Sequence, residues 1–131
     1  MKFSVLTTVY KKETPRNLRK SLLSSYQQTL KPTEIILVCD GELTEELYRE
    51  IQKLQREIPI LNVFHLPENL GSGPASLFGV NQCQTEFIAR MDSDDYSLET
   101  RFEKQLAAFE KNPNLIMVGS NILEKNTEFT A

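Results

Sequence analysis

The chain has 131 residues, of which 40% are hydrophobic and 25% charged, as expected for one globular domain. Its net charge of −3 gives no support for nucleic-acid binding, and no apolar run is long enough to span a membrane. Two cysteines are too few for a disulfide framework, and a strand pattern begins directly after Met1 without a signal peptide. We therefore expect a cytoplasmic protein, with docking to the inner face of a membrane left open.

The first half of the chain alternates strands with amphipathic helices. An apolar strand is predicted over 3–9, and Thr14 followed by Pro15 has the residue types of a helix N-terminus. The apolar stripe of this helix reaches Leu30, and Pro32 ends it. The next predicted elements are a strand over 34–38, a helix capped by Thr44 and ended by Pro59, and a strand over 60–66.

The second half continues the alternation. A loop over 67–73 precedes a short helix from Pro74 to about Cys83, and an apolar strand follows over 86–91. Ser97 is predicted to cap a further helix, and a fifth strand is predicted over 115–119. The residues expected on one face of that last helix are Leu98, Phe102, Leu106 and Phe109.

This alternation predicts an α/β fold of βαβ units, with a mostly parallel, Rossmann-like sheet in a three-layer αβα arrangement. A single domain over 1–131 is expected. In such sheets ligands bind beyond the carboxyl ends of the strands. The loops that should meet there are 7–14, 39–43, 67–73 and 91–96.

The strongest chemical signal is the acidic run that follows the strand over 86–91. Asp92, Asp94 and Asp95 stand within four residues, and packed carboxylates repel one another unless a cation lies among them. Oxygen ligands of this kind suit Mg²⁺ or Mn²⁺ together with a phosphate-bearing substrate. The alternative is a solvated acidic turn before the next helix.

The other loops carry weaker signals. The loop over 7–14 lacks glycine and the chain has no P-loop, which argues against a dinucleotide fold. Thr8 and Tyr10 either contact a base or belong to an ordinary polar surface loop. Asp40 either accepts a hydrogen bond from a base or simply forms a tight turn with Gly41. The loop over 68–73 can present N–H groups to an anion. Arg90 pairs with a ligand phosphate or a carboxylate, or forms a structural salt bridge.

In order and separation, several segments resemble the inverting family 2 glycosyltransferases of the GT-A fold. The resemblance covers 3–122, nearly the whole chain, and rests on segments that are individually modest. The matching segments are 4–10, 22–29, 34–41, 68–71 and 89–95.

The resemblance implies a role for each loop. Asp40 would read the base, typically uracil, while Asp92 and Asp94 would form a DxD pair, one near the ribose and one on a Mn²⁺ or Mg²⁺ that bridges the diphosphate. The implied nucleotide-sugar-binding residues are Thr8, Val9, Tyr10, Asp40, Asn69, Gly71, Arg90, Asp92 and Ser93, and the implied metal ligands are Asp94 and Asp92.

The chain departs from the family pattern at two places. Many members have two acidic residues where this chain has Cys39 and Asp40, and no carboxylate after Asp95 lies in a recognisable acceptor loop. An inverting displacement needs a carboxylate to take the acceptor's proton. The resemblance therefore implies the donor- and metal-binding N-terminal portion of a longer transferase, truncated before the acceptor-binding and catalytic-base region.

The implied reaction moves a sugar from a nucleotide-diphosphate sugar, with a UDP-sugar favoured, to a hydroxyl of a glycan or lipid-linked acceptor in polysaccharide synthesis. Two other classes compete with it, a Mg-dependent phosphoryl-transfer or phosphatase domain and a non-catalytic α/β metal-binding module. Both need acidic residues directly after the first strand, where this chain has Thr8, Val9 and Tyr10.

Overall fold

The computed structural model describes residues 2–111, 117–118 and 122–124. Its strands are β1 (Phe3–Val9), β2 (Glu34–Cys39), β3 (Leu61–His65), β4 (Phe87–Arg90), β5 (Met117–Val118) and β6 (Ile122–Glu124). Its helices are α1 (Pro15–Tyr26), α2 (Glu45–Glu57), α3 (Ser72–Gln82) and α4 (Arg101–Lys111).

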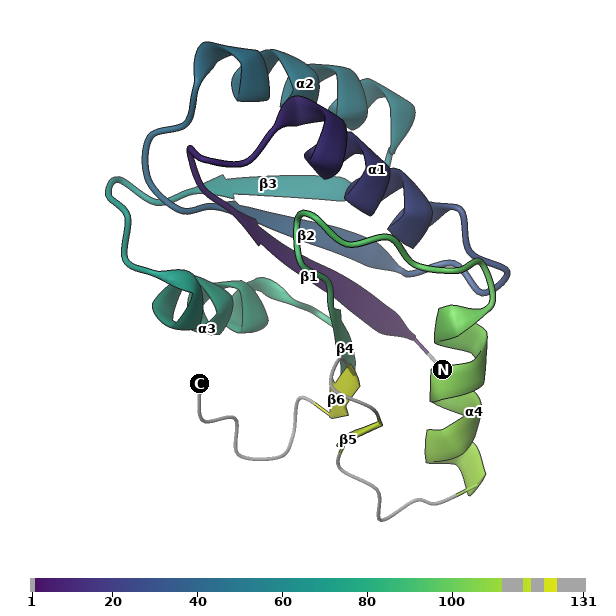
Figure 1. Ribbon diagram of the computed structural model, residues 1–131. Coiled ribbons are helices and arrows are strands. Elements are labelled where there is room, and N and C mark those ends of the chain that lie inside the picture. Colours follow the sequence, from purple (N-terminus) through teal and green to yellow (C-terminus); the bar gives the residue numbers. More distant parts are fainter. Residues whose placement is uncertain (1, 112–116, 119–121, 125–131) are drawn as a thin grey trace.

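The strands form one sheet in the order β3-β2-β1-β4-β6-β5 (Figure 1). The neighbours among β1 to β4 are parallel, and Leu6 of β1 stands opposite both Ile36 of β2 and Arg90 of β4. β6 runs antiparallel to β4, and β5 runs antiparallel to β6. The carboxyl ends of β1, β2 and β4 therefore lie side by side, as the alternating pattern predicts.

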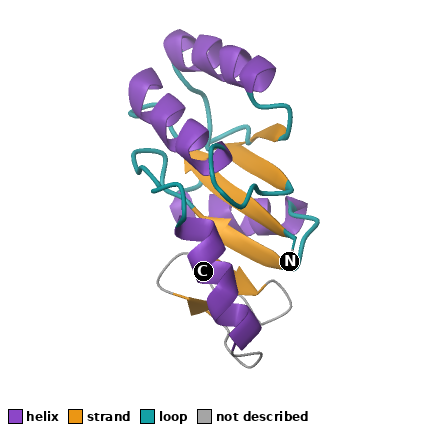
Figure 2. Cartoon of the chain, turned by 90° about the vertical axis from the view of Figure 1, so that its right-hand side faces the viewer, coloured by secondary structure: helices purple, strands orange, loops and turns teal. Residues whose placement is uncertain are grey.

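Helices cover both faces of the sheet, which confirms the three-layer αβα prediction (Figures 1 and 2). Alternate residues of β1 point to opposite faces. Val5 and Val9 pack with α1, α2 and α4 in the larger core, whereas Leu6 packs with α3 in the smaller one. β1 and β2 are buried on both faces, which explains why β2 is continuously apolar from Ile35 to Cys39.

Helix α3 lies unusually close to the sheet at Gly79. A Cβ atom at this position would stand 2.2 Å from Leu6 Cδ1, so a larger residue would require the buried Leu6 side chain to move. Within the described part of the chain, no helix is long and apolar enough to cross a membrane.

Several predicted boundaries are wrong. α1 ends at Tyr26, so Leu30 lies in the connection to β2, and α3 begins at Ser72, before Pro74. β6 was not foreseen. Of the strand predicted over 115–119, Met117–Val118 is a strand and the remainder lies outside the described residues.

The largest error concerns Ser97, which does not cap a helix. α4 begins at Arg101, and Leu98 precedes it with a largely exposed side chain. The N–H of Ser97 donates to Ser24 Oγ of α1 at 3.0 Å, and its own hydroxyl accepts from Arg101 at 2.6 Å. Contacts with α1 thus replace the local cap that the sequence suggested.

Candidate functional site

A cavity of about 320 Å³ opens at the carboxyl ends of β1 and β2. It brings together most of the residues predicted to contact a nucleotide. The lining residues are Thr8, Val9, Tyr10, Asp40, Asn69, Gly71 and Ser72. Ser72 is not among the residues that the resemblance implied, although it lies in the loop over 67–73 that was expected at this edge.

Asp40 is the structural centre of this cavity. Its side chain is buried, and its two carboxylate oxygens accept main-chain N–H groups from Leu70 at 2.7 Å and Gly71 at 3.1 Å. Its own N–H donates to Val9 O at 2.8 Å. The sequence indicated that the loop over 68–73 could present N–H groups to an anion, and the anion that the Leu70 and Gly71 N–H groups bind is the Asp40 carboxylate. Each carboxylate oxygen keeps one further lone pair for a ligand.

The turn after Asp40 requires glycine. Gly41 has φ of 86°, a conformation that other residues rarely adopt, and a Cβ there would lie 2.6 Å from the main-chain nitrogen of Asn69. The tight-turn and ligand interpretations of Asp40 and Gly41 are thus compatible. The turn brings Asp40 against the loop that forms the opposite wall of the cavity.

The acidic residues lie in a turn directly after β4, in which Asp95 N–H donates to Asp92 O at 3.1 Å. Asp92, Asp94 and Asp95 all have exposed side chains. Desolvation, and then the negative charges of Asp92 and Asp94, raise the pKa of Asp95, while Arg101 opposes the shift. The carboxylates are therefore close enough to repel one another.

This donor set fits a divalent cation only in part. In residues 2–111, no three His, Cys, Asp or Glu side chains are grouped for metal binding. Asp92 and Asp94 offer oxygen atoms at an exposed turn. Mg²⁺ is commonly bound by one or two carboxylates together with substrate phosphates and water. The pair therefore fits a cation that arrives with a diphosphate.

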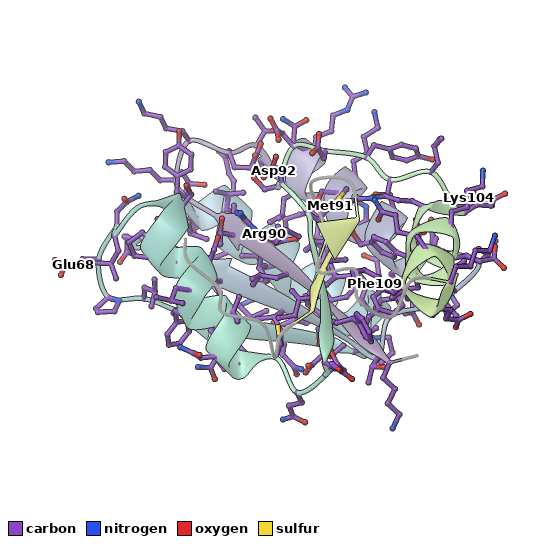
Figure 3. All side chains as sticks on the ribbon, turned by 90° about the horizontal axis from the view of Figure 1, so that it is seen from below. Glu68, Arg90, Met91, Asp92, Lys104 and Phe109 are labelled. Atoms are coloured by element: carbon purple, nitrogen blue, oxygen red, sulfur yellow. The ribbon has the colours of Figure 1, made fainter. Side chains whose placement is uncertain are left out.

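The side chains of Arg90, the last residue of β4, and of Met91, which follows it, point to opposite faces of the sheet (Figure 3). Asp92 comes next and begins the acidic turn. Met91 is buried in the core shared with α4. The Arg90 guanidinium donates to the hydroxyl of Ser76 on α3 at 3.0 Å. Within residues 2–111 it forms no ion pair within 4.0 Å, so of the alternatives left open for Arg90, neither a carboxylate pair nor a structural salt bridge is found in this part of the chain.

Glu13 joins the loop after β1 to the acidic turn. Its carboxylate accepts hydrogen bonds from Ser93 Oγ, from the N–H of Thr14 at 2.9 Å and from Asn17 at 3.0 Å. Although partial burial raises the pKa of Glu13, these bonds lower it below its ordinary value. Since Glu13 N–H donates to Tyr10 O at 3.0 Å, one residue links the cavity wall to Ser93.

The sequence did not point to Glu13, which accepts a hydrogen bond from the predicted residue Ser93, or to Ser76, which accepts one from the predicted residue Arg90. Nothing in their local sequence marks them, because each contacts a segment that is distant along the chain. A third missed group did leave a signal. Ser21 and Ser24 on α1, and Gln28 just after it, are polar residues three and four positions apart that alternate with the buried Leu18 and Leu22.

The family model "Glycosyl transferase family 2" matches residues 4–130. The amylovoran biosynthesis glycosyltransferase AmsE of Erwinia amylovora is 40% identical over 93% of this chain and 46% of its own length. A UDP-Gal:alpha-D-GlcNAc-diphosphoundecaprenol beta-1,3-galactosyltransferase of Escherichia coli is 39% identical over 94% of this chain and 44% of its own. The chain thus spans less than half the length of these relatives.

Solved structures of S. aureus TarS share the fold. TarS 1–349 superposes with a TM-score of 0.78 at 21% identity, over 95% of this chain and 47% of that chain. Its complex with UDP gives 0.74 at 27% identity, over 86% of this chain and 33% of that chain. The arrangement of strands and helices is therefore that of the GT-A fold, as the sequence motifs imply.

Proposed function

The chain belongs to glycosyl transferase family 2, and from this premise we propose that it binds the nucleoside diphosphate of a nucleotide sugar, with a uridine nucleotide favoured. We infer that the bound sugar is then transferred to a hydroxyl acceptor in polysaccharide or glycan synthesis. The family match leaves no support for the phosphoryl-transfer and metal-module alternatives.

The observation that carries the proposal is the cavity around Asp40. Its volume of about 320 Å³ is at the lower end of small-ligand sites, which suits a nucleoside portion. The Tyr10 side chain is 45% exposed, so its ring is available for stacking on a base. Asp40 is already fixed by Leu70 and Gly71, which leaves its remaining lone pairs in a set direction for a base N–H.

The diphosphate is proposed to lie between Arg90 and the acidic turn. Arg90 supplies a cation held by Ser76, and Asp92 and Asp94 would hold a Mn²⁺ or Mg²⁺ ion. A divalent cation in this place supplies Lewis-acid neutralisation of the charge on the leaving nucleotide. The residues of this chain then orient the donor, with Glu13 holding Ser93 at the edge of the turn.

The acceptor and the carboxylate that activates it are proposed to belong to the part of such proteins that this chain does not cover. The E. coli relative is named for a lipid-linked diphosphate acceptor, which supports a lipid-linked glycan as the acceptor class here. Such an acceptor would require a cytoplasmic protein to meet the inner face of a membrane. Both the location and this peripheral association are part of the proposal.

The test is a thermal-shift series with UDP, GDP and dTDP, each with Mn²⁺ and with EDTA. We expect UDP to stabilise the protein most, and Mn²⁺ to increase that shift. Asp94→Asn should abolish the increase that Mn²⁺ produces, while Glu46→Gln, which changes an exposed carboxylate on α2, should keep it. A shift with Mn²⁺ that survives in Asp94→Asn would overturn the metal assignment, and equal shifts for all nucleotides would overturn the base preference.

A further inference from the structure

Helix α1 and the residues directly after it carry a buried polar stripe, formed by Ser21, Ser24 and Gln28, that the donor site does not itself use. Ser21 and Ser24 are three residues apart on one face of α1, and Gln28 follows two residues after the helix ends. They are 0%, 6% and 4% exposed, respectively. Buried polar side chains destabilise a fold unless they form hydrogen bonds, so the partners of this stripe explain why it is present.

The partners are main-chain groups of the segment that carries the acidic turn and leads into α4. Ser21 Oγ donates to Asp92 O at 2.8 Å, and Ser24 Oγ accepts from Ser97 N–H at 3.0 Å. Gln28 Nε2 donates to Leu98 O at 2.7 Å, and Gln28 Oε1 accepts from Phe102 N–H at 3.2 Å. The stripe thus contacts both ends of a segment that contains no helix or strand between Arg90 and Arg101.

The contact at Asp92 matters most for the site. The carbonyl oxygen that Ser21 holds is separated by two bonds from the Cα atom that bears the Asp92 side chain. The next residue, Ser93, donates its hydroxyl to the Glu13 carboxylate. Asp95 N–H donates to the same Asp92 carbonyl oxygen that Ser21 binds. Asp92 O therefore accepts two hydrogen bonds, one from within the turn and one from α1.

We propose that Ser21 is a positioning residue, which fixes the Asp92 main chain and so sets the place of the Asp92 and Asp94 carboxylates before any ligand arrives. This inference rests on the proposed donor and cation site for its functional consequence. Ser24 and Gln28 hold the far end of the same segment. A site whose ligands are already in place loses less conformational entropy on binding.

The chain offers a matched control on the same helix. Ser25 is as buried as Ser21, but its hydroxyl donates to Ser21 O within α1 at 3.0 Å instead of to the acidic turn. Ser21→Ala and Ser25→Ala therefore remove the same atom at the same depth. Only the first removes a bond to the segment after β4.

The first measurement is amide hydrogen exchange by mass spectrometry, which requires no ligand. In Ser21→Ala, peptides covering residues 92–97 should exchange roughly tenfold faster, the effect of losing one hydrogen bond of ordinary strength. Peptides from β1 should be unchanged, and Ser25→Ala should resemble the parent protein in both regions. Unchanged exchange in residues 92–97, or equal acceleration in β1, would overturn the proposal, because the latter means general destabilisation.

The second measurement is the affinity for UDP with Mn²⁺ and with EDTA. Ser21→Ala should weaken UDP binding in Mn²⁺ by roughly three- to tenfold, as expected for loss of one hydrogen bond, and leave the affinity in EDTA unchanged. Equal weakening under both conditions would contradict a role that acts through the carboxylates. If the parent protein gains no affinity from Mn²⁺, the proposed cation site fails, whereas the exchange result still decides whether Ser21 positions the turn.

Discussion

The carboxylate of Asp40 and the main-chain N–H of Leu70 form a hydrogen bond of 2.7 Å that joins the end of β2 to the loop after β3. With the second bond to Gly71, it makes one buried side chain responsible for the shape of the cavity. Two segments that are 30 residues apart in the sequence therefore depend on a single carboxylate.

Replacing Asp40 should damage the fold and the cavity together. Asp40→Ala removes the acceptor of two N–H groups, and we expect a loss of about 2–4 kcal/mol in the free energy of unfolding, because hydrogen bonds to a charged group contribute about 1.5–3 kcal/mol each. Asp40→Asn keeps one acceptor oxygen, so its free energy of unfolding should lie between those of the parent protein and Asp40→Ala. Urea denaturation measures both variants, with exposed Glu42→Ala as the control. An Asp40→Ala protein of unchanged stability would contradict the role described here.

Gly41 is predicted to resist substitution. Gly41→Ala places a Cβ 2.6 Å from Asn69 N at a positive φ, and a left-handed conformation alone costs a non-glycine residue about 1–2 kcal/mol. We expect Gly41→Ala to lower the melting temperature and to weaken UDP binding. Gly73→Ala, in the first turn of α3 without a positive φ, should be neutral or slightly stabilising. Similar melting temperatures for the two variants would contradict this prediction.

Glu34 stabilises the opposite end of the sheet. Its buried carboxylate oxygen Oε2 accepts from Ser4 Oγ and from Gln84 N–H, each at 2.6 Å, so it ties β1, β2 and the connection before β4. Glu34→Ala leaves both donors without this acceptor, and we expect about 2–4 kcal/mol of destabilisation.

Because Glu34 lies at the amino ends of the strands, away from the cavity, its loss should lower the free energy of unfolding and leave the affinity for UDP unchanged. Guanidinium denaturation checks the first effect. The UDP affinity of the remaining folded protein, measured well below its melting temperature, checks the second. A specific loss of UDP affinity with full stability would refute this assignment.

The Cys39 thiol should be unreactive in the folded protein. Burial raises the pKa of Cys39 to about 12, so the thiolate needed for reaction is scarce at neutral pH. Cys39 and Cys83 lie buried in the cores on opposite faces of the sheet. We expect no thiol to react with Ellman's reagent at pH 8 until denaturant is added. Fast reaction of either thiol with Ellman's reagent in the native protein would contradict this prediction.

The same shift predicts a pH dependence of stability. The folded pKa is higher than the ordinary value, about 8.5, of a thiol in the unfolded chain. The folded state therefore retains a proton that the unfolded state loses. The contribution to stability is complete below about pH 8.5 and declines as the pH rises toward 12. Cys39→Ala should lessen that decline in urea denaturation carried out between pH 8 and 10.

The sequence by itself determined the alternation of strands and helices, the parallel sheet and the loops that meet at its carboxyl edge. These follow from local periodicity and from residues such as Pro15 and Thr44, whose effects extend over a few positions; the structure confirms both at the start of their helices. Because parallel strands end at one edge, the sequence also placed Thr8, Asp40 and Gly71 around one cavity.

The tertiary structure alone decided how those loops are held. Asp40 finds its partners in Leu70 and Gly71, Arg90 in Ser76, and Ser21 in Asp92. The wrong expectation that Ser97 caps a helix has the same origin, since its N–H binds Ser24 of α1. Local patterns report which backbone conformations a segment prefers. They do not report which distant polar group satisfies a buried hydrogen-bonding atom, because that depends on packing of elements far apart in the chain.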